Sequence, residues 1–453
     1  MHVRFAIPAA LLSLVLSAPS LRAQSIGALG NGLTAASVAR GGTMVAEHGD
    51  PLEAAQANPA GLAALGKRTL DVSGTALFVS GNFANSVDSN GSVRSFAGAI
   101  PYGAFGSPLG SSKWRASVAF TPDMLMRADW LYTDPAGTAG VTYGTQKNES
   151  EIVALRTSAN IARTVGSKWA FGGGLGLVYN TNTLHAPYIF QQQPGLAGLK
   201  VLIDLHTRGF GWNGNAGAQW QPSDRVRLGI SWKSATYIQS HGDLNGSAYA
   251  LFNVLGITAD PTFHYLAEVD NKLPQTAAAG LRWQVNHRAI LSFDGGWTGW
   301  AGAFESLPVK LKGGNNAIVN SVAGGTSIRD EVALNWHDQA AFHAGLELPV
   351  KKQWTGRAGY SYTSNPVPSS TLTPLTAAIL SNSVSAGAGY DPEDSGKPAN
   401  PLSPSAWHWD FAYQAQLPTT QSVGQSALQA GEYSNSRVHV LTQSITVSTR
   451  FLF

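Results

Sequence analysis

The chain has 453 residues, of which only 13% are charged, and it contains 50 glycines, 13 tryptophans and no cysteine. The charged fraction lies well below the roughly 25% that is typical of soluble domains. The lack of cysteine excludes a disulfide framework. A formal net charge of only +3 gives no reason to expect nucleic acid as a partner.

The first residues predict export from the cell. Arg4 provides a positive charge, residues 6–18 are apolar, and the small residue Ala23 follows as a cleavage position. The apolar run is shorter than the roughly 20 residues that a membrane-spanning helix needs. Residues 1–23 are therefore predicted to be a cleaved signal peptide. An uncleaved anchor is the alternative.

The next segment, residues 24–66, is rich in alanine and glycine and lacks the pattern of a strand. It is predicted to form a short helix over residues 51–57, followed by a turn at Asn58 and Pro59. Because it precedes the first strand, the lumen of a barrel is the natural place for it. We predict a small hatch, or plug, over residues 24–66.

From residue 67 onward, segments of alternating polarity recur. In one of them Leu70, Val72 and Phe78 face opposite to Asp71 and Ser73. Comparable alternation surrounds Trp232, Trp283, Tyr360 and Trp409. Since each segment offers one face to lipid and one to a polar lumen, the pattern predicts an all-β transmembrane antiparallel barrel over residues 67–453.

The predicted connections alternate between short turns and long loops, as in outer-membrane barrels. Short turns are expected at 165–168, 221–224, 285–288 and 350–353, and long extracellular loops at about 123–149, 183–206, 236–276, 299–338 and 364–381. The count is about 14 strands, with 12 or 16 left open.

Two of the predicted loops contain unusually apolar stretches. We select Phe190, Leu196 and Leu199 in the first, and Leu251, Phe252 and Leu255 in the second, as candidate residues for binding a hydrophobic small molecule. An exposed apolar patch often marks a binding site. The alternative is that the two loops only pack on each other and cap the barrel.

The last strand runs to the end of the sequence, where Ile445, Val447, Phe451 and Phe453 share one face. A terminal aromatic residue on such a strand resembles the signal that the barrel-insertion machinery of the outer membrane reads. Phe453 is therefore the expected contact with that machinery.

The sequence contains no Gly-x-Ser-x-Gly, His-Glu-x-x-His or P-loop motif. His337 and His343 are close in sequence, but on an extended strand they lie about 20 Å apart. They are more readily explained as lumen or rim residues than as metal ligands. We expect no enzyme activity, no metal site and no cofactor.

Four stretches together resemble the FadL family, whose members transport long-chain fatty acids and aromatic hydrocarbons across the outer membrane. The stretches are Ala36–Gly42 with Asn58–Leu62, Ser292–Trp300, Trp336–Leu346 and Trp354–Pro368. The Asn58-Pro59-Ala60 motif is the most characteristic of them. Their order and spacing agree with the family over nearly the whole chain after residue 23.

The resemblance implies a monomeric 14-stranded barrel in the outer membrane, in contact with its lipid and lipopolysaccharide. It implies that the hatch residues Arg40, Gly41, Asn58, Pro59 and Ala60 take part in gating. A hydrophobic ligand would pass from a groove on the loops into the lumen and leave sideways at a kinked third strand. That strand is expected at about residues 114–121, with Pro122 where pairing fails. A general diffusion porin and a surface interaction barrel are the alternatives.

Overall fold

The computed structural model describes residues 32–93, 98–110, 112–351, 353–392 and 404–453. The predicted signal peptide and the first residues of the predicted hatch lie outside these ranges. No helix within the described ranges has the length and apolar character needed to cross a membrane.

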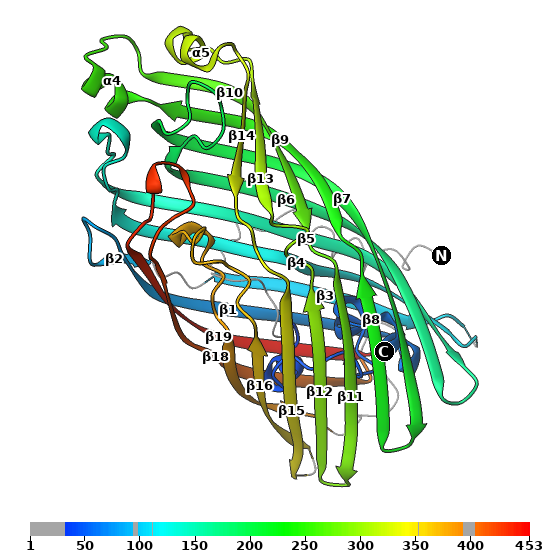
Figure 1. The fold of residues 1–453 in the computed structure, drawn as a ribbon. Coiled ribbons are helices and arrows are strands. Elements are labelled where there is room, and N and C mark those ends of the chain that lie inside the picture. Colours follow the sequence, from blue (N-terminus) through cyan, green and yellow to red (C-terminus); the bar gives the residue numbers. More distant parts are fainter. Residues whose placement is uncertain (1–31, 94–97, 111, 352, 393–403) are drawn as a thin grey trace.

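All strands belong to one antiparallel sheet that closes on itself (Figure 1). The first strand, β1 (Thr69–Ala84), pairs along its whole length with the last strand, β19 (Ser436–Leu452). The amide of Phe453 then donates to the carbonyl of Arg68 at 2.9 Å. Closure leaves neither terminal strand with an unpaired edge, which confirms the predicted barrel.

Within the described residues, 19 strand segments make up 14 antiparallel strands. The uninterrupted strands are β1, β4 (Trp114–Thr133), β5 (Thr145–Val165), β6 (Trp169–Ile189), β7 (Lys200–Ser223), β16 (Trp354–Thr363), β17 (Asn382–Tyr390), β18 (Ala406–Val423) and β19. The interrupted strands are β2 (Gly91–Val93) with β3 (Gly98–Pro108), β8 (Val226–Lys233) with β9 (Thr236–Ser247), β10 (Thr262–Leu273) with β11 (Thr276–Asn286), β12 (Ala289–Thr298) with β13 (Ser306–Lys312), and β14 (Ile328–Ala333) with β15 (Gln339–Lys351). The predicted number of about 14 strands is confirmed.

Helices are short and lie inside the barrel or in the loops. They are α2 (Ala35–Ala39), α3 (Pro51–Gln56), α4 (Tyr249–Leu255), α5 (Ala317–Ala323) and the 3₁₀ turns η1 (Pro59–Ala64), η2 (Thr138–Gly140), η3 (Pro374–Thr376) and η4 (Gln429–Gly431). The helix predicted over residues 51–57 is therefore present as α3.

The two faces of the strands differ as the alternation predicts. In β1, Asp71 and Ser73 are buried inside the barrel, whereas Val72 and Phe78 are exposed on its outside. Exposed aromatic side chains occur on the outer wall at Trp169, Phe171, Trp212, Trp232, Trp283, Trp354, Trp407 and Trp409. This outer wall suits lipid, and aromatic residues are typical of the membrane interfaces.

The connections at the two ends of the barrel differ in length. We call the end with the connections β5–β6, β7–β8, β11–β12 and β15–β16 the turn end and the other the loop end. The four short turns lie where the sequence predicts them. At the loop end, however, β4 continues to Thr133 and β7 already begins at Lys200.

Several predicted loops are thus largely strand. Ile203 and Leu205 are buried while Asp204 and His206 face outward, so these residues alternate as a strand does. The true loops shrink to 134–144, 190–199, 248–261 and 313–327, whereas the predicted loop 364–381 contains no strand. The apolar inner face of these extensions, rather than loop structure, explains why the stretch around residue 201 is apolar.

Candidate functional site

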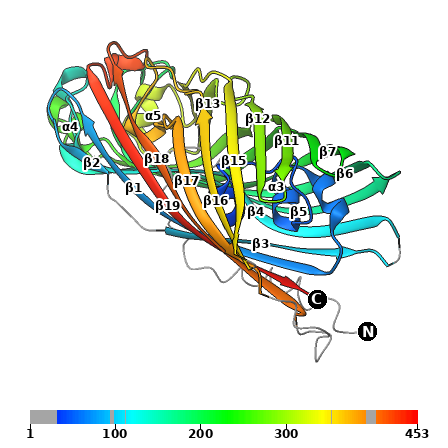
Figure 2. The same ribbon diagram turned by 90° about the horizontal axis from the view of Figure 1, so that it is seen from below.

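Residues 32–66, which we call the N-terminal segment, lie inside the barrel toward its turn end (Figure 2). Local sequence determines their helices. Thr34 caps α2 by accepting from the Ser37 amide, and Asp50 caps α3 ahead of Pro51. Asn58 caps η1, with its Oδ1 accepting from the Ala60 amide at 3.1 Å.

The predicted hatch residues contact the barrel wall. The Asn58 side chain donates to the carbonyls of Val45 and Ala218 at 2.8 and 3.3 Å, so it joins the segment to β7. Pro59 packs so closely on β6 that a Cβ atom at Gly172 would lie 2.5 Å from its carbonyl carbon. Ala60 follows as a buried residue of η1.

Gly41 has a φ of +70°, which favours glycine, and it lies against the backbone of β16. A Cβ atom at Gly41 would lie 2.7 Å from the amide nitrogen of Tyr360, and one at Gly359 would overlap the Gly41 amide nitrogen. The Gly41 carbonyl accepts from Nδ1 of the buried His343 at 2.7 Å. Because Gly41 and Gly359 have no side chains, the backbone of the N-terminal segment can contact the backbone of β16 here.

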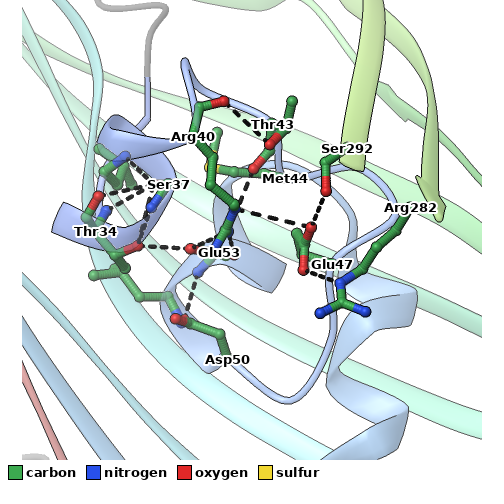
Figure 3. Close-up of polar contacts among 12 residues, drawn as sticks. Thr34, Ser37, Arg40, Thr43, Met44, Glu47, Asp50, Glu53, Arg282 and Ser292 are labelled. Atoms are coloured by element: carbon green, nitrogen blue, oxygen red, sulfur yellow. Dashed lines mark hydrogen bonds and ion pairs between the residues drawn. The ribbon is translucent and has the colours of Figure 1, made fainter. Parts of the chain in front are cut away.

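Buried charges join the N-terminal segment to the strands (Figure 3). Arg40 lies 3.1 Å from Glu53. It also lies 3.5 Å from Glu347 of β15. Glu47 lies 2.9 Å from Arg282 of β11 and accepts from Ser292 at 2.8 Å. Charges of opposite sign thus compensate each other at buried or partly buried positions.

Two further polar contacts involve residues of the strands. Asp294 of β12 accepts from the amides of Met44 and Val45 at 2.6 and 2.9 Å. Arg357 of β16 binds Glu347 at 2.7 Å and Asp410 at 2.6 Å. Among the described residues, no group of three or more histidine, aspartate or glutamate residues is arranged to hold a metal ion.

A largely apolar cavity, the upper cavity, lies in the loop-end half of the barrel and contains about 780 Å³ of empty space, part of it open to solvent. Its apolar wall consists of Ile152, Leu184, Tyr188, Phe190, Ile203, Leu205, Leu244, Val269, Leu307, Val309, Leu311 and Val332. Its polar residues are Ser150, Glu151, Asn182, Thr183, Asn271 and Asp330. No lysine or arginine is among these lining residues.

Of the six residues proposed for binding, only Phe190 lines this cavity. Leu196, Leu251 and Phe252 are buried in the adjoining loop cluster, with Leu199 partly buried against it. Leu255 is 58% exposed. The two loops therefore pack on each other, and the first of them contributes Phe190 to the wall of the cavity.

Asp330 positions the loop that carries Phe190. Its carboxylate accepts from the amides of Gln191 and Gln192 at 2.8 and 2.6 Å and from the Tyr188 hydroxyl at 2.6 Å. Sequence reasoning missed this residue, because the segments that meet there lie more than a hundred positions apart.

A second, amphipathic cavity, the lower cavity, lies between the upper half of the barrel and the N-terminal segment. It is lined by Met44, Gln56 and Ala57 of the segment, and by strand residues that include Asp123, Met124, Lys233, Asp294 and Trp297. Its empty space is about 1460 Å³, partly open to solvent. Trp300 and Trp336 add a buried aromatic wall.

Strand pairing fails between β3 and β4 beside this cavity. The last β3–β4 pair is Gly103 with Phe120, and pairing on that side resumes in the described residues only at Val93 with Trp130. On the other side, the register of β4 with β5 shifts between Pro122 and Met124. The break therefore comes at the predicted proline, although the strand itself continues to Thr133.

Apolar side chains occupy this gap. Leu125 of β4 belongs to one buried apolar cluster with Ile100 and Tyr102 of β3 and with Leu33 and Leu52 of the N-terminal segment. The gap is thus filled partly by residues that belong to the segment and not to the wall.

A family model described as outer membrane protein transport protein (OMPP1/FadL/TodX) matches residues 16–400. The chain belongs to this family. It is therefore an outer-membrane transport protein, and the prediction of transport instead of catalysis is confirmed. The sequence matches no curated protein.

Solved structures of the same architecture support the fold. The Pseudomonas putida toluene transporter TodX is 18% identical with a TM-score of 0.73, covering 95% of this chain and 100% of its own. A Pseudomonas aeruginosa FadL homologue is 18% identical with a TM-score of 0.72, covering 93% and 98%. The Ralstonia pickettii toluene transporter TbuX is 16% identical with a TM-score of 0.68, covering 94% and 99%.

The loops are held together by a buried charge cluster at the loop end. Lys200 is 1% exposed and donates to Asp134 at 2.8 Å, and it lies 3.6 Å from Glu432 of the loop before β19. Burial raises the pKa of Glu432 to about 7, with Asp134 adding to the rise and Lys200 opposing it.

The Gly359→Ala variant tests the close contact with Gly41. The added methyl group overlaps backbone, and such overpacking typically costs about 1–3 kcal/mol. We expect displacement of the N-terminal segment and a raised ion conductance in planar bilayers. Gly74→Ala is the matched control, because a Cβ atom there lies 3.9 Å from its nearest neighbour. Wild-type conductance in Gly359→Ala would show that the contact does not hold the segment.

The raised pKa of Glu432 predicts that the loops open as pH rises. The closed form binds the proton more tightly than the open form, in which a glutamate titrates near 4.5. The contribution of this proton to the stability of the closed loops is therefore complete below about pH 4.5, and it is lost as pH rises through about 7. Hydrogen exchange at 424–435, corrected for intrinsic rates, should be faster at pH 8 than at pH 5.5. Glu432→Gln should abolish that difference, and an unchanged pH dependence would contradict it.

Proposed function

We propose that this protein takes up hydrophobic small molecules passively, through the loops, the two cavities and a lateral exit between β3 and β4. The apolar upper cavity carries the proposal. Twelve of its 18 lining residues are apolar, as is usual for sites that bind hydrophobic small molecules. Burial of apolar surface contributes about 25 cal/mol per Å², which gives affinity without an energy source.

The charges favour uncharged ligands. Glu151 and Asp330 line the upper cavity, which has no lysine or arginine among its lining residues. Lys233 in the lower cavity is paired with Asp123. A carboxylate entering the upper cavity would lose its hydration without gaining a cationic partner. Hydrocarbons therefore fit this path better than fatty acid anions.

The lateral exit follows from the gap beside β4. A solute that leaves there enters the membrane interior without crossing the polar N-terminal segment. Leu33 and Leu52 occupy the gap, so passage requires the segment to move. A ligand can drive that movement only through a higher affinity for the moved state. Arg40, Gly41, Asn58, Pro59 and Ala60 hold the segment in place and thereby act in gating.

The TodX and TbuX structures are titled as toluene transporters, and another similar structure, CymD, is titled as a monoaromatic hydrocarbon channel. These descriptions agree in ligand class with the preference inferred from the charges. A single chain encloses both cavities, so we expect the monomer to be the functional unit.

The Val332→Trp variant tests the path. The larger side chain fills part of the upper cavity, and we expect uptake of radiolabelled octane to fall several-fold. The assay uses Gram-negative cells that lack another transporter of this family. Val384→Trp is the matched control, because Val384 is 45% exposed on the outer wall. Purified wild-type protein should bind octane more tightly than octanoate at pH 8.

Undiminished octane uptake by Val332→Trp would refute the path through the upper cavity. Steady wild-type ion conductance in planar bilayers would instead support a general diffusion porin, because a plugged barrel conducts almost no ions.

A further inference from the structure

A chain of four polar side chains connects the lower cavity to the N-terminal segment. Its members are Lys233 of β8, Asp123 of β4, Asn213 of β7 and Arg156 of β5, and we call them the polar chain. It ends on the carbonyl oxygen of Ala55 in α3.

Each link is a direct hydrogen bond. Lys233 donates to Oδ1 of Asp123, and the Asn213 amide donates to Oδ2 of Asp123 at 2.9 Å. Nε of Arg156 donates to Oδ1 of Asn213 at 2.8 Å. Nη1 of Arg156 then donates to the Ala55 carbonyl at 3.1 Å.

One member of the polar chain lies beside the lateral gap, and the chain ends on the helix that covers the gap from inside. Asp123 is the extra residue in β4 at which the register with β5 shifts, just beyond the last pair with β3. Ala55 and Leu52 belong to the apolar cluster that fills the gap. The polar chain thus ties the unpaired part of the wall to the helix that covers it.

Arg156 is the unusual member. It is 1% exposed, and within the described residues no carboxylate lies within 4.0 Å of its guanidinium group. Its acceptors are neutral oxygens of Ala55, Asn213 and Asn215. A buried cation requires compensating charge, and here the Asp123 carboxylate supplies it through Asn213. Lys233 and Arg156 therefore depend on one anion.

The wall is built to allow this contact. A Cβ atom at Gly176 of β6 would overlap Nε of Arg156 and lie 2.8 Å from Oδ1 of Asn213. The missing side chain lets residues of β5 and β7 meet across β6. The lower cavity also touches both ends, since Asp123, Lys233, Gln56 and Ala57 all line it.

We propose that the polar chain is the latch that holds α3 over the lateral gap, and that a ligand in the lower cavity releases it. The inference rests on the proposed function. A solute that enters between Asp123 on the wall and Ala57 on the segment separates the two ends of the chain. Arg156 then loses the Ala55 carbonyl, and α3 withdraws Leu52 from the gap. Asp123, Asn213 and Arg156 are positioning residues in this scheme.

The test measures how often the gap is uncovered. Because the chain has no cysteine, Leu52→Cys introduces a single thiol at a fully buried position in the gap. The measurement is the rate of its modification by a maleimide, with and without saturating octane. Octane should accelerate modification several-fold in the otherwise wild-type protein.

Asn213→Ala breaks the polar chain, and we expect at least a tenfold higher basal rate with no further acceleration by octane. Asn160→Ala is the matched control, since Asn160 is 3% exposed and Asn213 4% exposed, and Asn160 is bonded to Ser117 and Ser158 instead. The control should keep the low basal rate and the response to octane. Equal behaviour of the two variants would overturn the latch.

The ion pair gives a sharper test, because its two partners should act in opposite directions. Asp123→Asn leaves Lys233 and Arg156 without their anion and should raise the basal rate. Lys233→Met removes the cation that competes with Arg156 for Asp123, and it should lower the basal rate of modification. A purely structural pair would be weakened by either change, so a rise in both variants would overturn the proposal.

Octane binding, measured separately by equilibrium dialysis, distinguishes the two failures. If octane does not bind, the proposed function fails, and the basal rates still decide whether the latch exists. If octane binds while Asn213→Ala and Asn160→Ala behave alike, only the latch fails.

Discussion

The structure depends on one constraint, which is that lipid offers no hydrogen-bond partner to the backbone. Each strand must therefore pair on both sides, and β1 meets β19 for that reason. A lateral exit can exist only where pairing is given up. The wall gives it up between β3 and β4, directly beside Pro122, which has no amide proton to donate. Leu33 and Leu52 of the N-terminal segment belong to the apolar cluster that lies at this gap on the inside of the barrel.

The manner in which the N-terminal segment is held suits a part that moves. Several of its contacts with the wall are charged or polar, such as those of Glu47 with Arg282 and of Arg40 with Glu347. Small apolar clusters with β5 and β18 accompany them. Buried ion pairs add little net stability over apolar packing, but they are strongly selective for one arrangement. The ion pairs therefore favour one position of the segment, while the apolar clusters that it shares with the wall must separate and close again when it moves.

The sequence allowed prediction of what is local. Alternation in β1, the cap at Asp50 and the proline in β4 each act within a few residues, so strands, helix α3 and the break in pairing could be predicted. The sequence predicts a loop at the start of β7, where the structure has a strand, because the inner face of this extension is apolar. The pairing of Asp123 with Lys233 and the facing of Gly41 with Gly359 join residues more than a hundred positions apart. Only the closure of the barrel brings such residues together, and no local pattern encodes it.

The positions of the charged lining residues also explain the order of the two cavities. A solute first meets a wall whose lining has no lysine or arginine, so entry selects for apolar surface. It then reaches the lower cavity, which is lined by Asp123 and Lys233 of the strands and by residues of the N-terminal segment. An apolar solute gains nothing from solvating that ion pair, so its favourable route is toward the apolar side chains in the gap. On the route that we propose, the polar residues of the lower cavity would therefore direct the solute sideways into the membrane, whereas a uniformly apolar lumen would retain it.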